Sequence, residues 1–166
     1  RSLTDTDYFA RRQLRQLCTQ PHPSEDFLPQ ASEILPGLYL SDMYTATNPA
    51  VLARLGVTHL VSVQRDAPPT PALAHLRVPL DDARGADLQS VLAPAVLWIE
   101  RARRRGGTVL VHCVWGMSRS PALVIAFLMA AHRMPLGRAW AHVRARRAVA
   151  RPNAGFVRQL AAYGQV

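Results

Sequence analysis

The most constraining feature of this sequence is an apolar strand that leads through a glycine-containing loop into a long apolar helix. Residues 108–111 are rich in β-branched side chains, and residues 120–132 are almost entirely apolar. A strand without polar alternation suits the interior of a sheet that is covered on both faces. This unit predicts an α/β fold built on a mainly parallel sheet.

Strands and helices alternate along much of the remaining chain, which then ends in a helical tail. Pro36 and Gly37 predict a turn within a small hairpin at 33–40. Asn48, Pro49 and Gly56 mark the ends of a short helix, and Pro79 places its strand at an edge of the sheet or shortens it. The predicted strands are 57–63, 76–80 and 108–111, and the predicted helices are 49–56, 88–102, 120–132, 136–146 and 153–163.

The length of 166 residues corresponds to one domain. We expect an N-terminal helix and connector at 1–30, followed by a single domain at 31–166. Cys18, on that helix, and Cys113 lie in unlike surroundings, so no disulfide is expected and a reducing compartment is favoured. The apolar run at 122–131 is too short for a membrane span. We therefore expect a cytoplasmic protein, with the nucleus as a second location and no membrane partner.

The chain is strongly basic, with a formal charge of +9, and all 20 basic residues are arginine. This excess either indicates an anionic partner or reflects the residue usage of a GC-rich gene. Aromatic residues are not interleaved with the arginines, as binding of single-stranded nucleic acid would favour. Nucleic acid is therefore not the expected partner, and charge alone does not identify the ligand.

The loop between the predicted strand at 108–111 and the helix at 120–132 carries the chemistry. Such a connection directs backbone N–H groups and the positive end of the helix dipole toward one point, which makes an anion site. Cys113 at its base is then favoured as a thiolate nucleophile. Arg119 can bind two phosphate oxygens with its planar guanidinium. Gly116 is expected to let the backbone turn without a side chain that would obstruct the anion.

The sequence HCVWGMSRS at 112–120 resembles the signature of cysteine-dependent protein tyrosine phosphatases. Its continuation into Pro121 and an apolar helix resembles, more narrowly, the dual-specificity phosphatases. The length leaves no room for a separate kinase-docking domain, so the resemblance favours the small atypical members. The resemblance covers about residues 33–163 and includes RPNAGFVRQL at 151–160. It implies a central sheet with helices on both faces, a shallow active-site cleft, a phosphocysteine intermediate on Cys113, and no metal or cofactor.

The resemblance also requires a general acid on a separate loop. Asp81 and Asp82, about thirty residues before Cys113, are the candidates for this acid. The family places this acid six residues before the first apolar residue of the next helix, and counting back from Leu88 gives Asp82. Asp82 is therefore predicted to be the general acid and base, and Asp81 a solvated loop residue.

Other side chains receive roles from the resemblance together with ordinary alternatives. Ser120 resembles the hydroxyl that assists release of the thiolate, and a helix N-cap is an equally good explanation. His112 resembles the residue that orders the loop, or is a buried, hydrogen-bonded histidine. Asn153 is expected to cap the last helix and to brace the loop. The residues expected to contact substrate are Val114, Trp115, Gly116, Met117, Ser118 and Arg119, with Trp115 and Met117 packing on a substrate ring or on neighbouring loops.

The predicted function is hydrolysis of phosphotyrosine and phosphoserine or phosphothreonine in proteins. The variable positions of the loop contain no Lys or Arg, which disfavours a polyphosphorylated lipid or inositol. Two alternatives remain: a non-catalytic phosphate-binding scaffold on the same fold, and a phosphatase for RNA or another non-protein phosphate. The sequence does not specify the phosphoprotein partner or the oligomeric state.

Overall fold

A computed structural model describes residues 29–70 and 72–165, so the expected N-terminal helix and Cys18 lie outside the described residues. The elements in chain order are β1 (Ala31–Leu35), β2 (Leu38–Ser41), α2 (Met43–Ala46), α3 (Pro49–Leu55), β3 (His59–Ser62), β4 (Ala74–Arg77), α4 (Gln89–Arg104), β5 (Val109–His112), α5 (Arg119–Ala131), α6 (Leu136–Arg146) and α7 (Ala154–Tyr163). Every strand and helix predicted within this part of the chain is present, with ends displaced by a few residues. The one-turn helix α2 was not predicted.

The five strands form one sheet in the order β1-β2-β5-β3-β4. β1 and β2 form the predicted antiparallel hairpin, and the other three pairs are parallel. β5, whose four residues are all buried, is the central strand, and β4 is an edge strand, as Pro79 predicted. The prediction of a mainly parallel α/β sheet is therefore confirmed.

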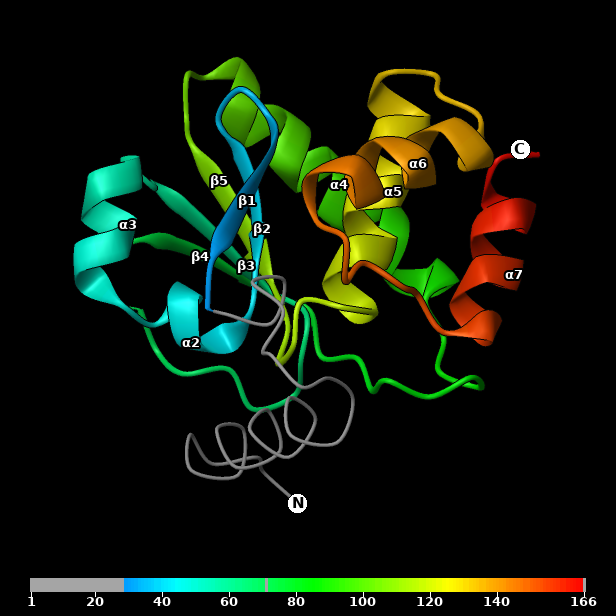
Figure 1. Cartoon of the computed structure of the whole chain (residues 1–166), viewed down its shortest axis with the longest axis horizontal. Helices are drawn as coiled ribbons and strands as arrows, with labels where there is room; N and C mark the ends of the chain where they lie inside the picture. The colour runs from blue at the N-terminus through cyan, green and yellow to red at the C-terminus, as the bar shows by residue number, and fades with distance from the viewer. Residues whose placement is uncertain (1–28, 71, 166) are drawn as a thin grey trace, which may run out of the picture.

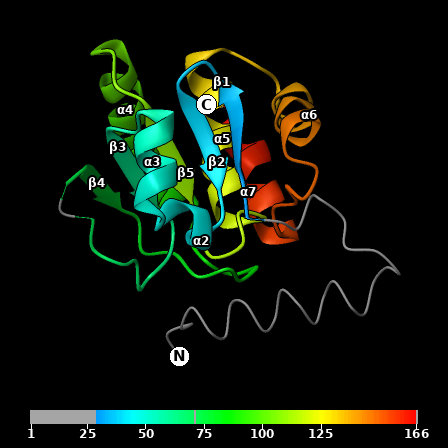
Figure 2. The same cartoon turned by 60° about the vertical axis from the view of Figure 1, so that its left-hand side comes forward.

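Helices cover both faces of the sheet (Figures 1 and 2). The larger core lies on the face covered by α4, α5, α6 and α7, where Phe127, Phe156 and Ile99 are buried with apolar residues of the strands. A smaller cluster on the other face joins Leu52 of α3 to Leu60 and Leu110 of the sheet. Because α5 packs against the sheet, α4, α6 and α7, ten consecutive residues of this helix from Ser120 to Met129 are buried. Its lack of a polar face follows from this position.

Local sequence explains where the shorter helices begin and end. The Asn48 side chain caps α3 by accepting hydrogen bonds from two backbone N–H groups, and Gly56 ends the helix with φ of 67°. Such a left-handed conformation favours glycine. The unpredicted helix α2 begins at Asp42, whose buried side chain accepts the N–H of Thr45 at 2.7 Å. A helix of one turn is too short to show a periodic pattern of apolar residues, so α2 was not predicted.

The parallel strands β2, β5, β3 and β4 end at the same edge of the sheet. The chain segments that follow them contain Asp42, Cys113, Arg65 and Asp82, respectively. Residues that are far apart in the sequence therefore meet at the carboxyl edge of the sheet, which is where open α/β sheets place their ligands.

Candidate active site

The loop from Cys113 to Ser118, here called the cysteine loop, connects β5 to α5. Five consecutive carbonyl oxygens of this loop, from Cys113 to Met117, accept hydrogen bonds from donors outside it. The donors, in order, are His112 Nδ1 at 3.2 Å, Met43 N–H at 3.1 Å, Arg147 Nη2 at 3.3 Å, Arg147 Nε at 2.8 Å and Arg151 N–H at 2.6 Å. All five carbonyls are thus directed outward.

The outward carbonyls determine where the N–H groups of the loop point. All described peptide bonds are trans, and in a trans peptide the N–H points away from the C=O of the same unit. The N–H groups of residues 114–118 therefore face the inside of the loop, next to the N-terminus of α5. Backbone N–H groups that converge at a helix N-terminus form an anion site.

Cys113 lies at the base of this concave loop, with 2% of its surface exposed, and is a free thiol. The Gly116 N–H donates to its Sγ at 3.2 Å, and the Ser120 hydroxyl donates at 3.1 Å. Both donors are directed at the sulfur from within the loop and from the first turn of α5. The N-cap position of α5 belongs to Ser118, so the N-cap explanation for Ser120 is wrong and the contact with the sulfur remains.

Gly116 lets the backbone turn as predicted, but the atoms that exclude a side chain there are not those of a bound anion. Its φ of 64° lies in the left-handed region, and a Cβ there would lie 2.5 Å from the Ser41 carbonyl oxygen and 2.6 Å from Arg147 Nη2. Those atoms surround the outer side of the loop. Glycine thus allows the loop to pack against β2 and Arg147, whereas the expectation was that it leaves room for the anion.

Arg119, the first residue of α5, connects the cysteine loop to the segment that contains Asp81 and Asp82. Its Nη1 donates to the Leu80 carbonyl oxygen at 3.3 Å. Its Nε is buried and has no hydrogen-bond partner among the described residues. A buried guanidinium N–H without a partner is costly, and a phosphate oxygen would satisfy it.

The two predicted acids have different partners. Asp81 forms a bidentate ion pair with Arg65, at 2.7 and 2.9 Å. The hydrogen bond from Arg65 lowers the pKa of Asp81 from its ordinary value, and the charges of Arg65 and Arg119 act in the same direction. The Asp82 carboxylate instead accepts a hydrogen bond from Asn153 Nδ2 at 2.9 Å. Asp82 thus has a neutral partner, while Asp81 is neutralised by an arginine.

The loop that contains these acids, residues 80–88 and here called the aspartate loop, is attached to α7. Gln159 accepts the N–H groups of Leu88 and Gln89, at 2.8 and 3.1 Å, and donates to the Ala86 carbonyl at 2.9 Å. A Cβ at Gly155 would overlap the backbone of Arg84. Helix α7 therefore sets the position of Asp82, a role for Gln159 and Gly155 that the sequence analysis did not identify.

Asn153 caps α7 as predicted, by accepting the Phe156 N–H at 3.0 Å. Its side-chain NH2 group binds Asp82, and its backbone N–H donates to Ser118 Oγ at 2.9 Å. This one residue thus contacts the aspartate loop through its side chain and the cysteine loop through its backbone.

The side chains of the predicted substrate-contacting residues are not equally accessible. Val114 and Ser118 are buried, with 4% and 7% of their surfaces exposed, so any contact with substrate would involve their backbone. Trp115 is half-buried and packs against the pair Met43 and Val114, and Met117 is half-buried too. Their predicted contact with a substrate ring stays a prediction.

Arg147 is the principal residue that the sequence analysis missed. It is 3% exposed, and besides the two loop carbonyls it donates to Ser32 Oγ and the Gln30 carbonyl, both at 3.2 Å. The sequence offered no signal for this role, because Arg147 follows Arg144 and Arg146 at a helix end, where basic residues are ordinary.

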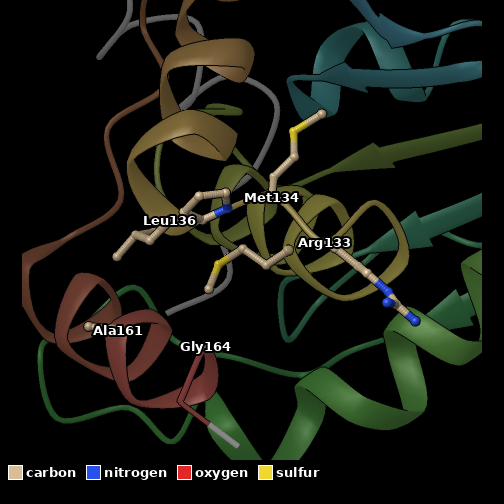
Figure 3. Close-up of a pocket in the computed structure, with 7 residues that line it drawn as sticks. Arg133, Met134, Leu136, Ala161 and Gly164 are labelled. Carbon is tan, nitrogen blue, oxygen red and sulfur yellow. The ribbon is translucent and has the colours of Figure 1, made fainter.

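A separate hollow lies where α5 leads into α6 and beside the end of α7, and has a volume of about 520 Å³. Met129, Leu136 and Ala161 contribute to its lining, and the Arg133 guanidinium points away from Leu136 and Ala161 (Figure 3).

In residues 29–70 and 72–165, no three His, Cys, Asp or Glu side chains are grouped to hold a metal ion. Within the same residues, no helix has the length and apolar character to cross a membrane.

The fold and the cysteine loop agree with the comparison to known families. The family model described as "Dual specificity phosphatase, catalytic domain" matches residues 38–166. The chain therefore belongs to the dual specificity phosphatase family, a family of protein phosphatases, which are hydrolases.

One similar protein is dual specificity protein phosphatase 1 of Arabidopsis thaliana, which is 41% identical over 75% of this chain and 64% of the relative. Dual specificity phosphatase 28 of Mus musculus is 39% identical over 86% of this chain and 88% of the relative. The chain spans only 35% of dual specificity protein phosphatase 5 of Rattus norvegicus. The chain thus spans less than two thirds of the length of the Arabidopsis thaliana and Rattus norvegicus proteins.

Solved structures give the same result. A variant of human dual specificity phosphatase 28 superimposes with a TM-score of 0.80 at 40% identity, covering 82% of this chain and 95% of that one. A putative dual specificity phosphatase of mouse, complexed with zinc tungstate, gives a TM-score of 0.79 at 38% identity, with 88% and 93% covered. The predicted dual-specificity phosphatase fold is confirmed.

Proposed function

We propose that this chain hydrolyses phosphotyrosine and phosphoserine or phosphothreonine in proteins through a phosphocysteine intermediate. The observation that carries the proposal is the arrangement around Cys113. Its sulfur receives two hydrogen bonds at the base of a loop whose first five carbonyls are held outward. This arrangement stabilises a thiolate and binds a phosphate at the same point.

In the first step, the Cys113 thiolate attacks phosphorus and the bond to the ester oxygen breaks. Asp82 donates its proton to that oxygen, which leaves as the alcohol or phenol. The inward N–H groups of the cysteine loop and the Arg119 guanidinium bind the three remaining phosphoryl oxygens. The product of this step is phosphocysteine and a dephosphorylated side chain.

In the second step, the Asp82 carboxylate takes a proton from water as the water oxygen attacks phosphorus. The S–P bond breaks, inorganic phosphate is released, and the electron pair returns to Cys113. The Ser120 hydroxyl, 3.1 Å from the sulfur, donates to the departing thiolate. Asp82 is protonated again at the end of the cycle, so no external acid is consumed.

The choice of Asp82 over Asp81 rests on their partners. Arg65 lowers the pKa of Asp81, which makes Asp81 a poorer proton donor near neutral pH. The Asp82 carboxylate accepts its hydrogen bond from the neutral amide of Asn153, so proton transfer at Asp82 breaks no ion pair with that partner. The charge of Arg119 also contributes to the shift at Asp81, so both carboxylates need to be tested.

A protein substrate is favoured over a polyphosphorylated small molecule. The side chains between Cys113 and Arg119 include no cation that would bind a second phosphate group. The non-catalytic alternative is kept because one similar structure, at 33% identity and a TM-score of 0.77, is that of a human tyrosine phosphatase-like serine/threonine/tyrosine-interacting protein. The presence of Cys113, Arg119 and Asp82 together supports the catalytic alternative.

The test is hydrolysis of an aryl phosphate and of phosphotyrosine and phosphoserine peptides, in a buffer that contains EDTA. We expect activity in the parent protein and none above background in Cys113→Ser. Asp82→Asn is expected to lower kcat by about 100-fold, whereas Asp81→Asn lowers it only slightly. An inactive parent, or an active Cys113→Ser, would exclude this mechanism. A larger loss in Asp81→Asn than in Asp82→Asn would reverse the assignment of the acid.

A further inference from the structure

A chain of hydrogen bonds runs across the sheet and ends at the first carbonyl of the cysteine loop. Thr70 Oγ1 lies 2.9 Å from His75 Nδ1, and His75 Nε2 lies 2.8 Å from Ser62 Oγ. Ser62 Oγ lies 2.6 Å from His112 Nε2, and His112 Nδ1 lies 3.2 Å from the Cys113 carbonyl oxygen. These side chains belong to β4, β3 and β5 and to the loop before β4, so the series of hydrogen bonds links three strands of the sheet.

The strand register explains why these side chains meet. Ser62 and His112 are partners in the parallel pair of β3 and β5. His75 of β4 is paired with Leu60 of β3. Ser62 lies two residues beyond Leu60 on β3, so the side chains of His75 and Ser62 are on the same face of the sheet. A diagonal neighbour at this distance is within the reach of a long side chain such as histidine.

The donor and the acceptor of each hydrogen bond in this series follow from the final acceptor, the Cys113 carbonyl oxygen. A carbonyl oxygen only accepts, so His112 carries its proton on Nδ1. When His112 is neutral, its Nε2 must accept, and Ser62 therefore donates its single hydroxyl proton to it. The Ser62 oxygen is then left to accept the N–H of His75. Ser62 and His75 thereby stabilise the one neutral tautomer of His112 that can donate to the Cys113 carbonyl oxygen.

The environment keeps His112 neutral. Burial lowers the pKa of His112 to about 4, although the hydrogen bond to Cys113 opposes this effect, and the charges of His75 and Arg119 lower the pKa further. Burial and then the charge of Arg77 lower the pKa of His75 as well. Near neutral pH both rings are uncharged, so each has one N–H and one acceptor nitrogen.

We propose that Ser62 and His75 are positioning residues that act through His112 to hold the cysteine loop in the shape that stabilises the Cys113 thiolate. Without the Ser62 hydroxyl, the ring proton of His112 can move to Nε2. The lone pair of Nδ1 then faces the Cys113 carbonyl oxygen, and two acceptors repel each other. The first peptide of the loop rotates, and the Gly116 N–H and the Ser120 hydroxyl lose their alignment with the sulfur.

This inference rests on the proposed function, because it concerns the same nucleophile, but its test requires no turnover. The variants are made in a Cys18→Ser background, in which Cys113 is the only thiol. The rate of alkylation by iodoacetamide is measured against pH, and the midpoint of the curve reports the thiolate. The ¹⁵N chemical shifts of the His112 ring identify its tautomer directly.

In the Cys18→Ser parent we expect the Nδ1–H tautomer of His112. Ser62→Ala is expected to show Nε2–H and an alkylation midpoint about one pH unit higher. His75→Phe retains the Ser62 hydroxyl but removes its donor, so the midpoint rises by a smaller amount, whereas His75→Gln, whose amide can donate to Ser62, restores the parental value. His59→Phe, on β3 but outside the chain of hydrogen bonds, is the matched control and is expected to leave the midpoint unchanged.

An unchanged tautomer and midpoint in Ser62→Ala would overturn the proposal. Thermal unfolding shows whether Ser62→Ala is folded. If it is not, the proposal is tested by comparing His75→Phe with His75→Gln, which change a half-buried residue of the edge strand. Equal midpoints in that pair would then overturn it. A protein that shows these shifts but hydrolyses no phosphate ester would contradict the proposed function alone.

Discussion

The cysteine loop and the aspartate loop are held in very different ways. Five carbonyls of the cysteine loop receive donors from β5, α2 and the segment after α6, and its cysteine is buried. The aspartate loop exposes Asp81 and Asp82 and is attached mainly to α7, through Gln159 and Asn153. Cys113 is therefore held by much of the fold, whereas Asp82 is positioned by one helix.

This difference predicts that a substitution that disturbs the aspartate loop leaves the cysteine loop undisturbed. A change at the cysteine loop should alter both the stability of the protein and the reactivity of Cys113, because buried groups lose their partners. A change where α7 meets the aspartate loop should lower turnover while Cys113 reacts with iodoacetamide as before. The predictions below test this separation.

The largest effect is expected for Arg147→Met, which removes the donors of two loop carbonyls. One buried and one half-buried carbonyl without partners cost about 2–6 kcal/mol in the free energy of unfolding. The displaced loop should also lower kcat/KM by about 100-fold. Chemical unfolding and steady-state kinetics measure both effects. Arg146→Met, at the exposed neighbouring position, is the control, and equal behaviour of the two variants would contradict the role of Arg147.

Acid should destabilise the protein through His112. Its pKa in the folded state, about 4, lies below the ordinary value of 6.5, so the unfolded chain binds the proton more readily. The stability that neutral His112 contributes is present above pH 6.5 and is lost as the pH falls toward 4, by about 3 kcal/mol. Urea unfolding at about pH 7 and about pH 4.5 measures this loss. His112→Asn should weaken the pH dependence and His132→Asn should not, and an equal dependence in both would exclude His112 as its source.

A smaller effect is expected for Gly155→Ala, whose new methyl group would overlap the backbone of Arg84. The aspartate loop should move away from α7 and lower kcat by about 10-fold. The alkylation rate of Cys113 should equal that of the parent. Gly137→Ala, where a Cβ meets no atom within 4 Å, is the matched control. Slower alkylation in Gly155→Ala would show that the two loops are not separable.

The smallest effect is expected for Asn153→Ser. Serine retains the cap of α7, so the stability should change little. The hydrogen bond to Asp82 is lost, which should lower kcat by about 2- to 10-fold, the equivalent of one hydrogen bond of about 0.5–1.5 kcal/mol. Kinetics with Asp82→Asn as the background give the control, because Asn153→Ser should have almost no further effect there. A full additional loss would mean that Asn153 acts elsewhere.

Much of the fold was predictable because its signals are local. The caps Asn48 and Asn153, the turn at Gly37 and the apolar run of α5 depend on neighbours in the sequence, and each prediction was confirmed. The helix α2 was missed because one turn is too short to show a periodic pattern. At Gly116 the predicted turn of the backbone was confirmed by its positive φ, but the atoms that exclude a Cβ there belong to Ser41 and Arg147, which are distant in the sequence.

The sequence by itself determined the chemistry of the loop, since Cys113, Gly116, Arg119 and Ser120 lie within eight residues and a strand and a helix set their spacing. Only the tertiary structure decided what holds that loop and which acid is free of an arginine. Arg147, Asn153 and the pair Ser62 and His75 reach the site through the packing of helices and the register of strands. Such contacts join residues dozens of positions apart, and no local pattern of a single sequence encodes them.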